Sequence, residues 1–413
     1  MKTILFPTLG SSGDVIPLLS LSQAMNKRGY QAKLIASPVF QNLASETNVD
    51  LIPLGTEQQF NAMLNNPNLW HPTRGFSVIV QHSILPFLRP IFDIIRTFDP
   101  KNTLIVSPLL LFGAHLAHEK YGYPFVTLQL QPSLLRSVFA PPVLGGYKIP
   151  AWVPPALVRF YYKMLDQSFI DPVLAPAINA YREELGLSAV QRIFDRFLFS
   201  PIKNICLFPE WFAPPQPDWP PNTSLTGFIA PQGANEMLSP ELKAFLSEGD
   251  KPLVFTAGTA MRHGNEFFQT GISATQMLEK RAVFVSRQSQ QMPDDLPKEI
   301  LYQPYADFSQ LLPHASVFIY HGGIGSLAQA TAAGVPQLIM PLSQDQPDNA
   351  ARIRRLGLGD SIEPHQFKPK IVAQKIERLS SDPNVQSNCQ KYAAKIDFKE
   401  SLEKTIRELE TCL

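Results

Sequence analysis

Short apolar runs typical of buried strands alternate with longer helix-like segments along the whole chain, in one series in the first half and another in the second. This alternation is the pattern of parallel α/β sheets that helices cover on both faces. The sequence therefore predicts an α/β protein with two parallel sheets. The predicted strands lie at 3–8, 32–37, 50–55, 103–109, 125–130 and 204–209, and then at 252–258, 282–286, 300–304, 317–321 and 336–342.

The two series are separated by a stretch, 209–239, so dense in proline that regular helix is excluded over most of it. A chain of 413 residues with 45% hydrophobic residues is long and apolar enough to build two cores. We expect an N-terminal Rossmann-like domain over 1–226, a linker over 227–239 and a C-terminal Rossmann-like domain over 240–413. The last segment, 368–413, is predicted to be a helical tail of the second domain, broken at Pro383.

Composition excludes several partners. Lys and Arg number 36 against 35 Asp and Glu, so no basic field exists to hold nucleic acid. Cys206, Cys389 and Cys412 are too far apart in sequence for a disulfide framework or a zinc cluster, which indicates a reducing, cytoplasmic location. The apolar stretch 104–117 is shorter than the roughly 20 residues that span a bilayer, so no transmembrane helix is expected.

A glycine-rich loop follows one strand of the second half. The strand ends at His321, Gly322, Gly323 and Gly325 form the loop, and a helix begins near Ser326. Glycines let backbone amides approach an anion, and the helix dipole adds about half a positive charge at that end. The imidazole adds a hydrogen-bond donor. The pattern predicts a diphosphate site that needs no metal, although a tight strand-to-helix turn alone would use the same glycines.

One strand later, Asp345 and Gln346 precede a helix that Pro347 can start and Gly357 can end. An aspartate in this position can serve as a helix N-cap, so the residues alone leave a structural role open for Asp345.

The letters HGGIGS, followed by AGVPQLIMPLSQDQPDNAARIRRLGLG, resemble the family 1 glycosyltransferases, which include plant, macrolide, sterol and antibiotic glycosyltransferases. The resemblance implies a GT-B fold, in which two Rossmann-like domains face each other across a cleft, and a nucleoside diphosphate sugar as donor, expected to be UDP-linked. It assigns the pyrophosphate to His321 with Gly322, Gly323, Gly325 and Ser326, and the sugar hydroxyls to Asp345 and Gln346. Many members carry a ribose-binding Glu where this chain has Gln329, so UDP and TDP both remain open.

Two other positions resemble donor-site residues of the family. Gly258 and Thr259 follow the first strand of the second half, as a Gly-Ser pair near the phosphates does in relatives. A glycine after a strand is also simply a turn signal. Tyr302 stands where relatives often place an aromatic that stacks on the base, and its alternative role is a half-buried strand tyrosine.

At the N-terminus a strand runs into the loop Gly10, Ser11, Ser12 and Gly13, and a helix starts around Asp14. An acid there can simply cap the helix. The letters GSSGDVIPLLSLS resemble the N-terminal signature of sterol and antibiotic members, which have an Asp where plant relatives keep a catalytic His. The resemblance implies that the loop lies on the acceptor side and that Asp14 is the general base.

Transfer to an alcohol needs such a base, because the hydroxyl must lose its proton as it attacks the anomeric carbon. A helix N-terminus lowers the pKa of an aspartate and burial raises it, and the sequence leaves the balance open. Direct attack inverts the anomeric centre. Leaving-group charge would be met by N–H groups, and the chain has no D-x-D triplet, so neither metal nor cofactor is expected.

The sequence thus predicts an inverting hexosyltransferase that uses UDP-glucose or a similar donor and a small, hydrophobic acceptor. A non-catalytic nucleotide-sugar-binding subunit and a GT-B epimerase or phosphorylase are the alternatives. Segment 133–165 mixes aromatic residues with Arg and Lys. It can be acceptor pocket wall, helices packed over the sheet, or a shallow, peripheral membrane contact.

Overall fold

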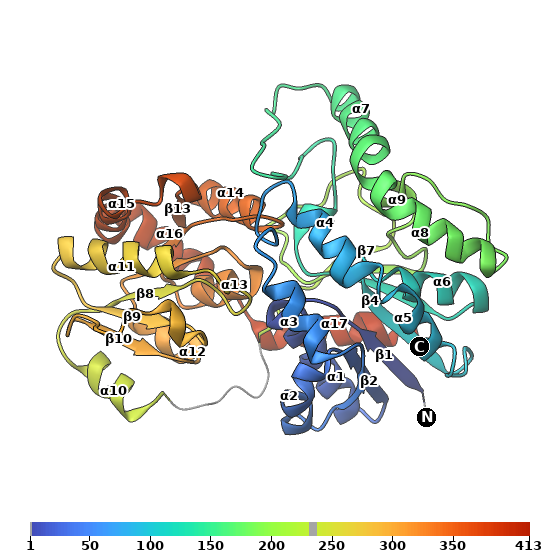
Figure 1. Cartoon of the computed structure of the whole chain (residues 1–413), viewed down its shortest axis with the longest axis horizontal. Helices are drawn as coiled ribbons and strands as arrows, with labels where there is room; N and C mark the ends of the chain where they lie inside the picture. Colours follow the sequence, from blue (N-terminus) through green and yellow to red (C-terminus); the bar gives the residue numbers. More distant parts are fainter. Residues whose placement is uncertain (1, 231–237) are drawn as a thin grey trace.

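Two parallel sheets, each in its own domain, form the framework of the molecule (Figure 1). The computed structural model describes residues 2–230 and 238–413. Every run predicted as a strand contains one, and the α/β architecture with two Rossmann-like sheets is confirmed. Residues 231–237 of the predicted linker lie outside the described residues, so the limits set at 226 and 240 remain predictions.

The N-terminal sheet has the order β3-β2-β1-β4-β5-β6-β7, with all neighbours parallel. Its strands are apolar and almost fully buried at the centre, as expected when helices cover both faces. The last strand, β7, was not predicted because it is three residues long and half-buried at the sheet edge. The strands are β1 (Thr3–Pro7), β2 (Gln31–Ala36), β3 (Asp50–Pro53), β4 (Thr103–Pro108), β5 (Phe125–Gln129), β6 (Lys203–Cys206) and β7 (Thr223–Leu225).

The C-terminal sheet has the order β10-β9-β8-β11-β12-β13 and is also parallel throughout. Its edge strand β13 was not predicted, because it has only three residues and these are half-buried, as in β7. The strands are β8 (Leu253–Thr256), β9 (Ala282–Val285), β10 (Ile300–Gln303), β11 (Val317–Tyr320), β12 (Gln337–Ile339) and β13 (Gly359–Ser361).

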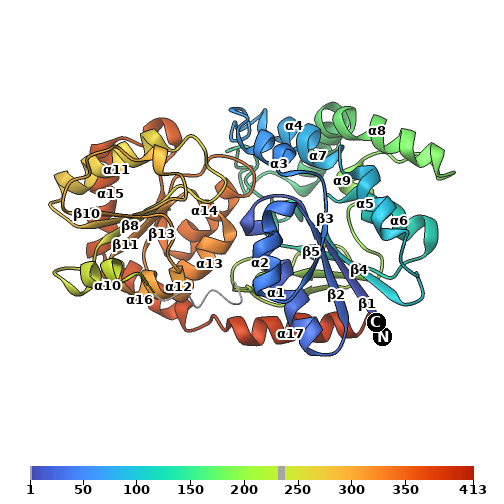
Figure 2. The same cartoon turned by 60° about the horizontal axis from the view of Figure 1, so that its bottom comes forward.

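Helices cover both faces of each sheet (Figures 1 and 2). In the first domain two π-helical turns, η2 (Val80–Ile84) and η4 (Asp166–Ile170), interrupt longer helical runs. The α-helices are α1 (Ser12–Lys27), α2 (Gln41–Glu46), α3 (Glu57–Leu64), α4 (Gly75–Ile79), α5 (Leu88–Ile95), α6 (Phe112–Tyr121), α7 (Pro155–Leu165), α8 (Asp171–Glu184), α9 (Ile193–Arg196), α10 (Pro240–Ser247), α11 (Asn265–Met277), α12 (Phe308–Leu311), α13 (Ile324–Ala332), α14 (Gln346–Leu356), α15 (Pro369–Ser381), α16 (Pro383–Ala393) and α17 (Phe398–Glu410).

The helical tail predicted over 368–413 is present and breaks at Pro383, but its last helix leaves the C-terminal domain. Helix α17 runs beneath the N-terminal domain (Figure 2), where Leu402, Ile406 and Leu409 join the core built on β1 and α1. Arg28 at the end of α1 pairs with Glu403 and Glu410. The apolar face of α17 is therefore buried in the N-terminal domain, and the C-terminal helix packs on that domain.

The helical run Gly75–Ile95 is long and apolar enough to cross a membrane by length and composition, and half of it is buried. The buried half includes Val80, Ile84, Ile91 and Phe92, which pack in the core of the N-terminal domain with β4 and α6. This packing is typical of the core helix of a folded domain.

Each sheet reverses its winding direction at its first strand. In the first sheet, β2 and β3 are added on one side of β1 and β4 is then added on the other side. In the second sheet, β9 and β10 are added on one side of β8 and β11 on the other. Ligands of open parallel sheets bind beyond the carboxyl ends of the strands at such reversals. The two places so defined are the loops after β1 and β4 and the loops after β8 and β11.

Candidate active site

The loops after β8 and β11 meet around the ring of His321. A Cβ atom on Gly258 would lie 2.5 Å from Cε1 of His321, and one on Gly323 would lie 2.6 Å from its Nε2. Gly258 also has φ of +91°, which favours glycine. The ring is thus held between two glycine backbones, and the structure brings together the two strand ends that the sequence predicted separately.

The N-terminus of α13 is built to receive an anion. Gly323 is its N-cap residue and has no side chain to cap the helix, so the first-turn N–H groups of Ile324, Gly325 and Ser326 have no side-chain cap. Nothing lies within 4 Å of a Cβ built on Gly325, so this approach is open. Open amides and the helix dipole together favour a phosphate group here.

Burial lowers the pKa of His321 to about 4, so the imidazole is neutral at pH 7. Its Nδ1 is buried and has no hydrogen-bond partner within the part of the chain that the structure describes. A buried polar atom without a partner is rare and costly, and it marks a place where a ligand group can bind. A neutral imidazole can still donate one N–H to a phosphate oxygen.

Asp345 occupies the N-cap position of α14, but its carboxylate accepts a hydrogen bond from Asn349 Nδ2 at 2.7 Å. The same Nδ2 lies 2.9 Å from the carbonyl oxygen of Gly322. Asn349, which the sequence analysis passed over, therefore ties the carboxylate of Asp345 to the glycine loop. Gln346 is buried, and its Oε1 accepts the N–H of Leu342 at 2.8 Å, which leaves its amide nitrogen for a ligand.

Asp14 lies in the first turn of α1, where its Oδ2 accepts the backbone N–H of Ser11 at 2.9 Å. The capping role that the sequence left open is therefore real. Gly10 lies against the carboxylate of Asp14 and has φ of +106°. A Cβ atom on Gly10 would lie 2.3 Å from Oδ2 of Asp14, so this position requires glycine. Capping does not exclude catalysis, because the carboxylate keeps a second oxygen.

Both carboxylates have raised pKa values, and the charge of Asp14 contributes to the shift of Asp345. Desolvation raises the pKa of Asp14 from 3.8 to about 6, against the opposing effect of its hydrogen bonds to Ser11. The pKa of Asp345 rises to about 7, first through desolvation and next through the negative charge of Asp14. Burial thus outweighs the helix N-terminus at Asp14, and the charge of this N-terminal-domain carboxylate acts on Asp345 in the C-terminal domain.

The other predicted donor residues lie on α13, in the loop after β8 and on β10. Gln329 lies one turn into α13, with its Nε2 3.4 Å from the carbonyl oxygen of Gly325. Thr259 is exposed after β8. Tyr302 is half-buried on the edge strand β10 and donates its phenol hydrogen to the carbonyl of Ser286 at 2.8 Å, so its hydroxyl is engaged while part of the ring stays accessible.

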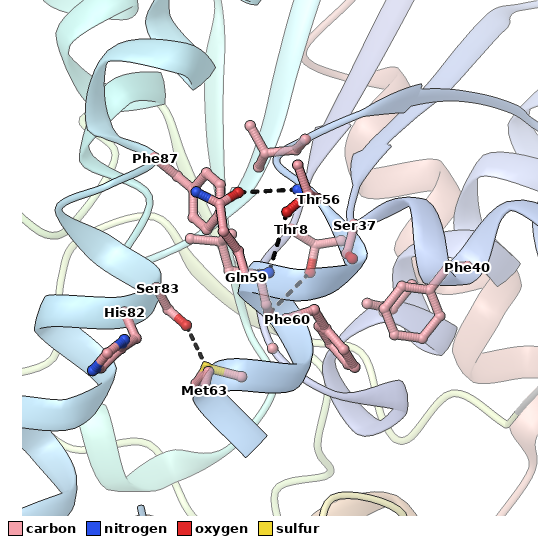
Figure 3. A pocket seen from close by; sticks show the side chains of 14 residues that line it. Thr8, Ser37, Phe40, Thr56, Gln59, Phe60, Met63, His82, Ser83 and Phe87 are labelled. Atoms are coloured by element: carbon pink, nitrogen blue, oxygen red, sulfur yellow. Dashed lines mark hydrogen bonds between the residues drawn. The ribbon is translucent and has the colours of Figure 1, made fainter. Parts of the chain in front are cut away.

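A pocket next to Gly10 was not predicted. It lies at the carboxyl ends of β1, β2 and β3 under α3 and η2, and most of its wall is apolar (Figure 3). The rings of Phe40 and Phe60 meet edge to face, 5.7 Å apart, and Ser37 Oγ is buried without a partner in the described chain. The lining residues are Thr8, Leu9, Gly10, Val15, Ser37, Phe40, Leu54, Thr56, Gln59, Phe60, Met63, His82, Ser83 and Phe87.

Contacts between the domains lie beside the site. Gln344 Nε2 donates to the carbonyl of Leu69 at 3.2 Å, and Asp348 Oδ1 accepts the N–H of Val143 at 3.0 Å. The start of α14 and the loop before it therefore contact loops of the N-terminal domain. Among the described residues, no group of three or more His, Cys, Asp or Glu is arranged to hold a metal ion.

Two family models match the chain, one in each domain. The glycosyltransferase family 28 N-terminal domain matches residues 4–140, and the C-terminal domain of erythromycin biosynthesis protein CIII-like proteins matches residues 275–406. The O-mycaminosyltylonolide 6-deoxyallosyltransferase of Streptomyces fradiae is 25% identical over 386 residues, which cover 91% of this chain and 89% of that protein.

Solved structures share the whole fold. The glycosyltransferase of kitacinnamycin superimposes with a TM-score of 0.74 at 18% identity and covers 100% of this chain and 99% of its own. The glycosyltransferase VinC in complex with DTDP gives 0.68 at 17% identity, with 99% of each chain covered.

The two facing Rossmann-like domains and the family models define the protein as a glycosyltransferase of the GT-B fold that uses a nucleotide-sugar donor. Within that class, the matched models and the antibiotic and sterol glycosyltransferases among its relatives support the family 1 resemblance of the sequence.

Proposed function

We propose that this protein is an inverting, metal-independent hexosyltransferase that glycosylates a hydroxyl of a small hydrophobic acceptor. The observation that carries the proposal is the carboxylate of Asp14, which lies beside the apolar pocket and has a pKa raised to about 6. A general base works best when its pKa lies near the working pH, and an ordinary aspartate is too acidic for this task.

The chemistry follows from the positions of the groups. Asp14 accepts the proton of the acceptor hydroxyl while the hydroxyl oxygen forms a bond to the anomeric carbon of the donor. The bond between that carbon and the diphosphate oxygen breaks on the opposite face, so the configuration inverts. The negative charge of the leaving diphosphate falls to the amides at the start of α13 and to His321, which are already oriented. No cation or other cofactor is required in this scheme.

Asp345 and Gln346 are proposed to hold the sugar. The Asp345 carboxylate is oriented by its hydrogen bond from Asn349. The Gln346 side-chain oxygen accepts the N–H of Leu342, which orients the amide and leaves its nitrogen to donate to a ligand. A carboxylate accepts hydrogen bonds from sugar hydroxyls, and an amide donates them, so the pair suits a hexose.

The donor nucleotide is proposed to be UDP or TDP. The relative from Streptomyces fradiae is named for a 6-deoxyallosyl group, and one structural relative holds DTDP. Gln329 is one turn into α13 and can hydrogen-bond a hydroxyl of the nucleotide sugar, of which UDP and DTDP share the 3′-hydroxyl.

The acceptor is proposed to pack against the residues that line the pocket under α3 and η2, whose enclosed volume of about 20 Å³ holds little more than one water molecule. The pocket wall carries the rings of Phe40, Phe60 and Phe87, and the buried Ser37 hydroxyl offers a polar anchor without a partner in the described chain. Pockets with apolar walls and a few polar groups suit small molecules with one or two hydroxyls.

The test is transfer by the purified protein from UDP- and TDP-hexoses to a panel of hydrophobic alcohols and phenols, followed by mass spectrometry of the products. The anomeric configuration of the product, measured by NMR against that of the donor, decides the stereochemistry. Retained configuration would contradict the mechanism. Conversion of the donor without any glycosylated product from the panel would contradict the proposed acceptor class.

A further inference from the structure

A cluster of large apolar side chains stands in solvent on the N-terminal domain, although the function proposed above makes no use of it. Six of the thirteen exposed large hydrophobic residues in the described chain fall within eighteen residues. Trp152 is 81% exposed and Tyr147 is 76% exposed. The α7 patch consists of Tyr147, Trp152, Leu157, Phe160, Tyr161 and Met164.

Four members of the patch form a stripe along α7. Leu157, Phe160, Tyr161 and Met164 follow the i, i+3, i+4, i+7 spacing of one helix face, and all are exposed. The helix already has its own buried side, where Val158 and Tyr162 pack with Val138. The exposed stripe is therefore a second apolar face with nothing packed on it in the described chain.

The charges around the patch are positive. Lys148, Arg159 and Lys163 are exposed, and none of them forms an ion pair with a described residue. The single acidic residue between 139 and 170 is Asp166, which is fully buried and paired with Arg136. The patch therefore combines apolar area, aromatic rings with polar tips and uncompensated cations.

The loop that precedes the patch reaches the C-terminal domain beside the candidate active site. The loop that precedes α7 donates the N–H of Val143 to Asp348, three residues after Asp345. A Cβ on Gly145 in the same loop would lie 3.6 Å from the carbonyl of Pro72, in the segment between α3 and α4. In Figure 1 α7 and the loop that precedes it extend above the rest of the N-terminal domain.

We propose that the α7 patch docks this protein onto a lipid bilayer that contains anionic lipids. Trp and Tyr favour the boundary between acyl chains and headgroups, and Lys and Arg flanking an apolar helix face are attracted to anionic headgroups. A protein partner would need a surface whose shape matches the patch, and the structure offers no evidence of one, whereas a bilayer with anionic lipids supplies apolar and anionic groups without a fixed shape. If the proposed function holds, docking also brings a hydrophobic acceptor from the bilayer to the cleft.

The test is sedimentation of the purified full chain with vesicles of phosphatidylcholine, with or without phosphatidylglycerol. We expect binding to the vesicles with phosphatidylglycerol, weakened by salt. The double variant W152S/F160S removes two exposed rings and should bind about tenfold less well. Lys163→Glu reverses one charge and should weaken binding about fivefold or more. Met277→Ser removes an exposed side chain of α11 and serves as the matched control, with unchanged binding.

Trp152 also reports on docking, since the other three tryptophans, Trp70, Trp211 and Trp219, are at least half-buried. Its emission should shift to shorter wavelength on vesicle binding and be quenched by brominated lipids. Melting temperatures of the variants check that the fold survives. These measurements of membrane binding do not depend on transferase activity, so they test the docking proposal even if the proposed function is wrong.

Equal binding by wild type and W152S/F160S, or equal binding to both kinds of vesicle, would overturn the proposal. So would absence of vesicle binding together with self-association, in sedimentation velocity, that the double variant abolishes. That result would assign the patch to an interface between two copies of this chain.

Discussion

Asp14→Asn is the most informative single change, because the structure gives Asp14 both a capping and a catalytic role. Asparagine keeps the shape and can still accept the N–H of Ser11, so the first turn of α1 should persist. The amide cannot take a proton from the acceptor, and turnover should fall by about two to four decades. Affinity for the nucleoside diphosphate alone should change little, since the diphosphate site lies in the other domain.

The stability of the variant should rise with pH relative to wild type. Raising the pKa of Asp14 from 3.8 to about 6 means that ionising it in the folded state costs about 3 kcal/mol more than in the unfolded state. Because the side chain is partly exposed, we expect about half of that. The folded state binds the proton more tightly, so this cost is absent below about pH 4 and complete above about pH 6.

The assay is urea unfolding of both proteins at pH 4 and pH 7.5, together with transfer rates and donor binding at pH 7.5. We expect equal stability at the lower pH and an Asn variant more stable by about 1–2 kcal/mol at the higher pH. Asp93→Asn, on the exposed surface of α5, is the control for the chemical change itself. An active Asn variant would remove Asp14 from the mechanism, and an Asn variant less stable at pH 7.5 would refute the argument from burial.

Three further predictions concern the donor side and the pH dependence. The acid limb of kcat/KM should lie near pH 6–7, where Asp14 and Asp345 titrate, and a limb near pH 4 would contradict the raised pKa values. His321→Ala should lower kcat/KM about 10- to 100-fold through loss of one hydrogen bond to a charged phosphate, worth about 1.5–3 kcal/mol, and wild-type kinetics would remove His321 from the site. Excess EDTA should leave the transfer rate nearly unchanged, and a loss that magnesium or manganese restores would replace the proposed leaving-group chemistry with a metal-dependent one.

Some features of this protein followed from local sequence alone. A buried parallel strand needs a continuous apolar run and a turn after it, and both are visible without knowledge of neighbours, so each predicted strand is present. Strands β7 and β13 were missed because three half-buried residues at a sheet edge leave no such run. The residue types at the strand ends, including His321 and Asp14, were also visible in the sequence.

The tertiary structure decided how those pieces combine. Winding reversals at β1 and β8 bring loops that are far apart in sequence to one place, so Gly258 meets His321 and Asp14 influences Asp345. Sequence could state that a helix N-terminus and burial oppose each other at Asp14, but only the surrounding atoms determine how much water the carboxylate loses. The apolar pocket and the return of α17 to the first domain have the same origin, because both depend on which surfaces pack together after the strands have formed.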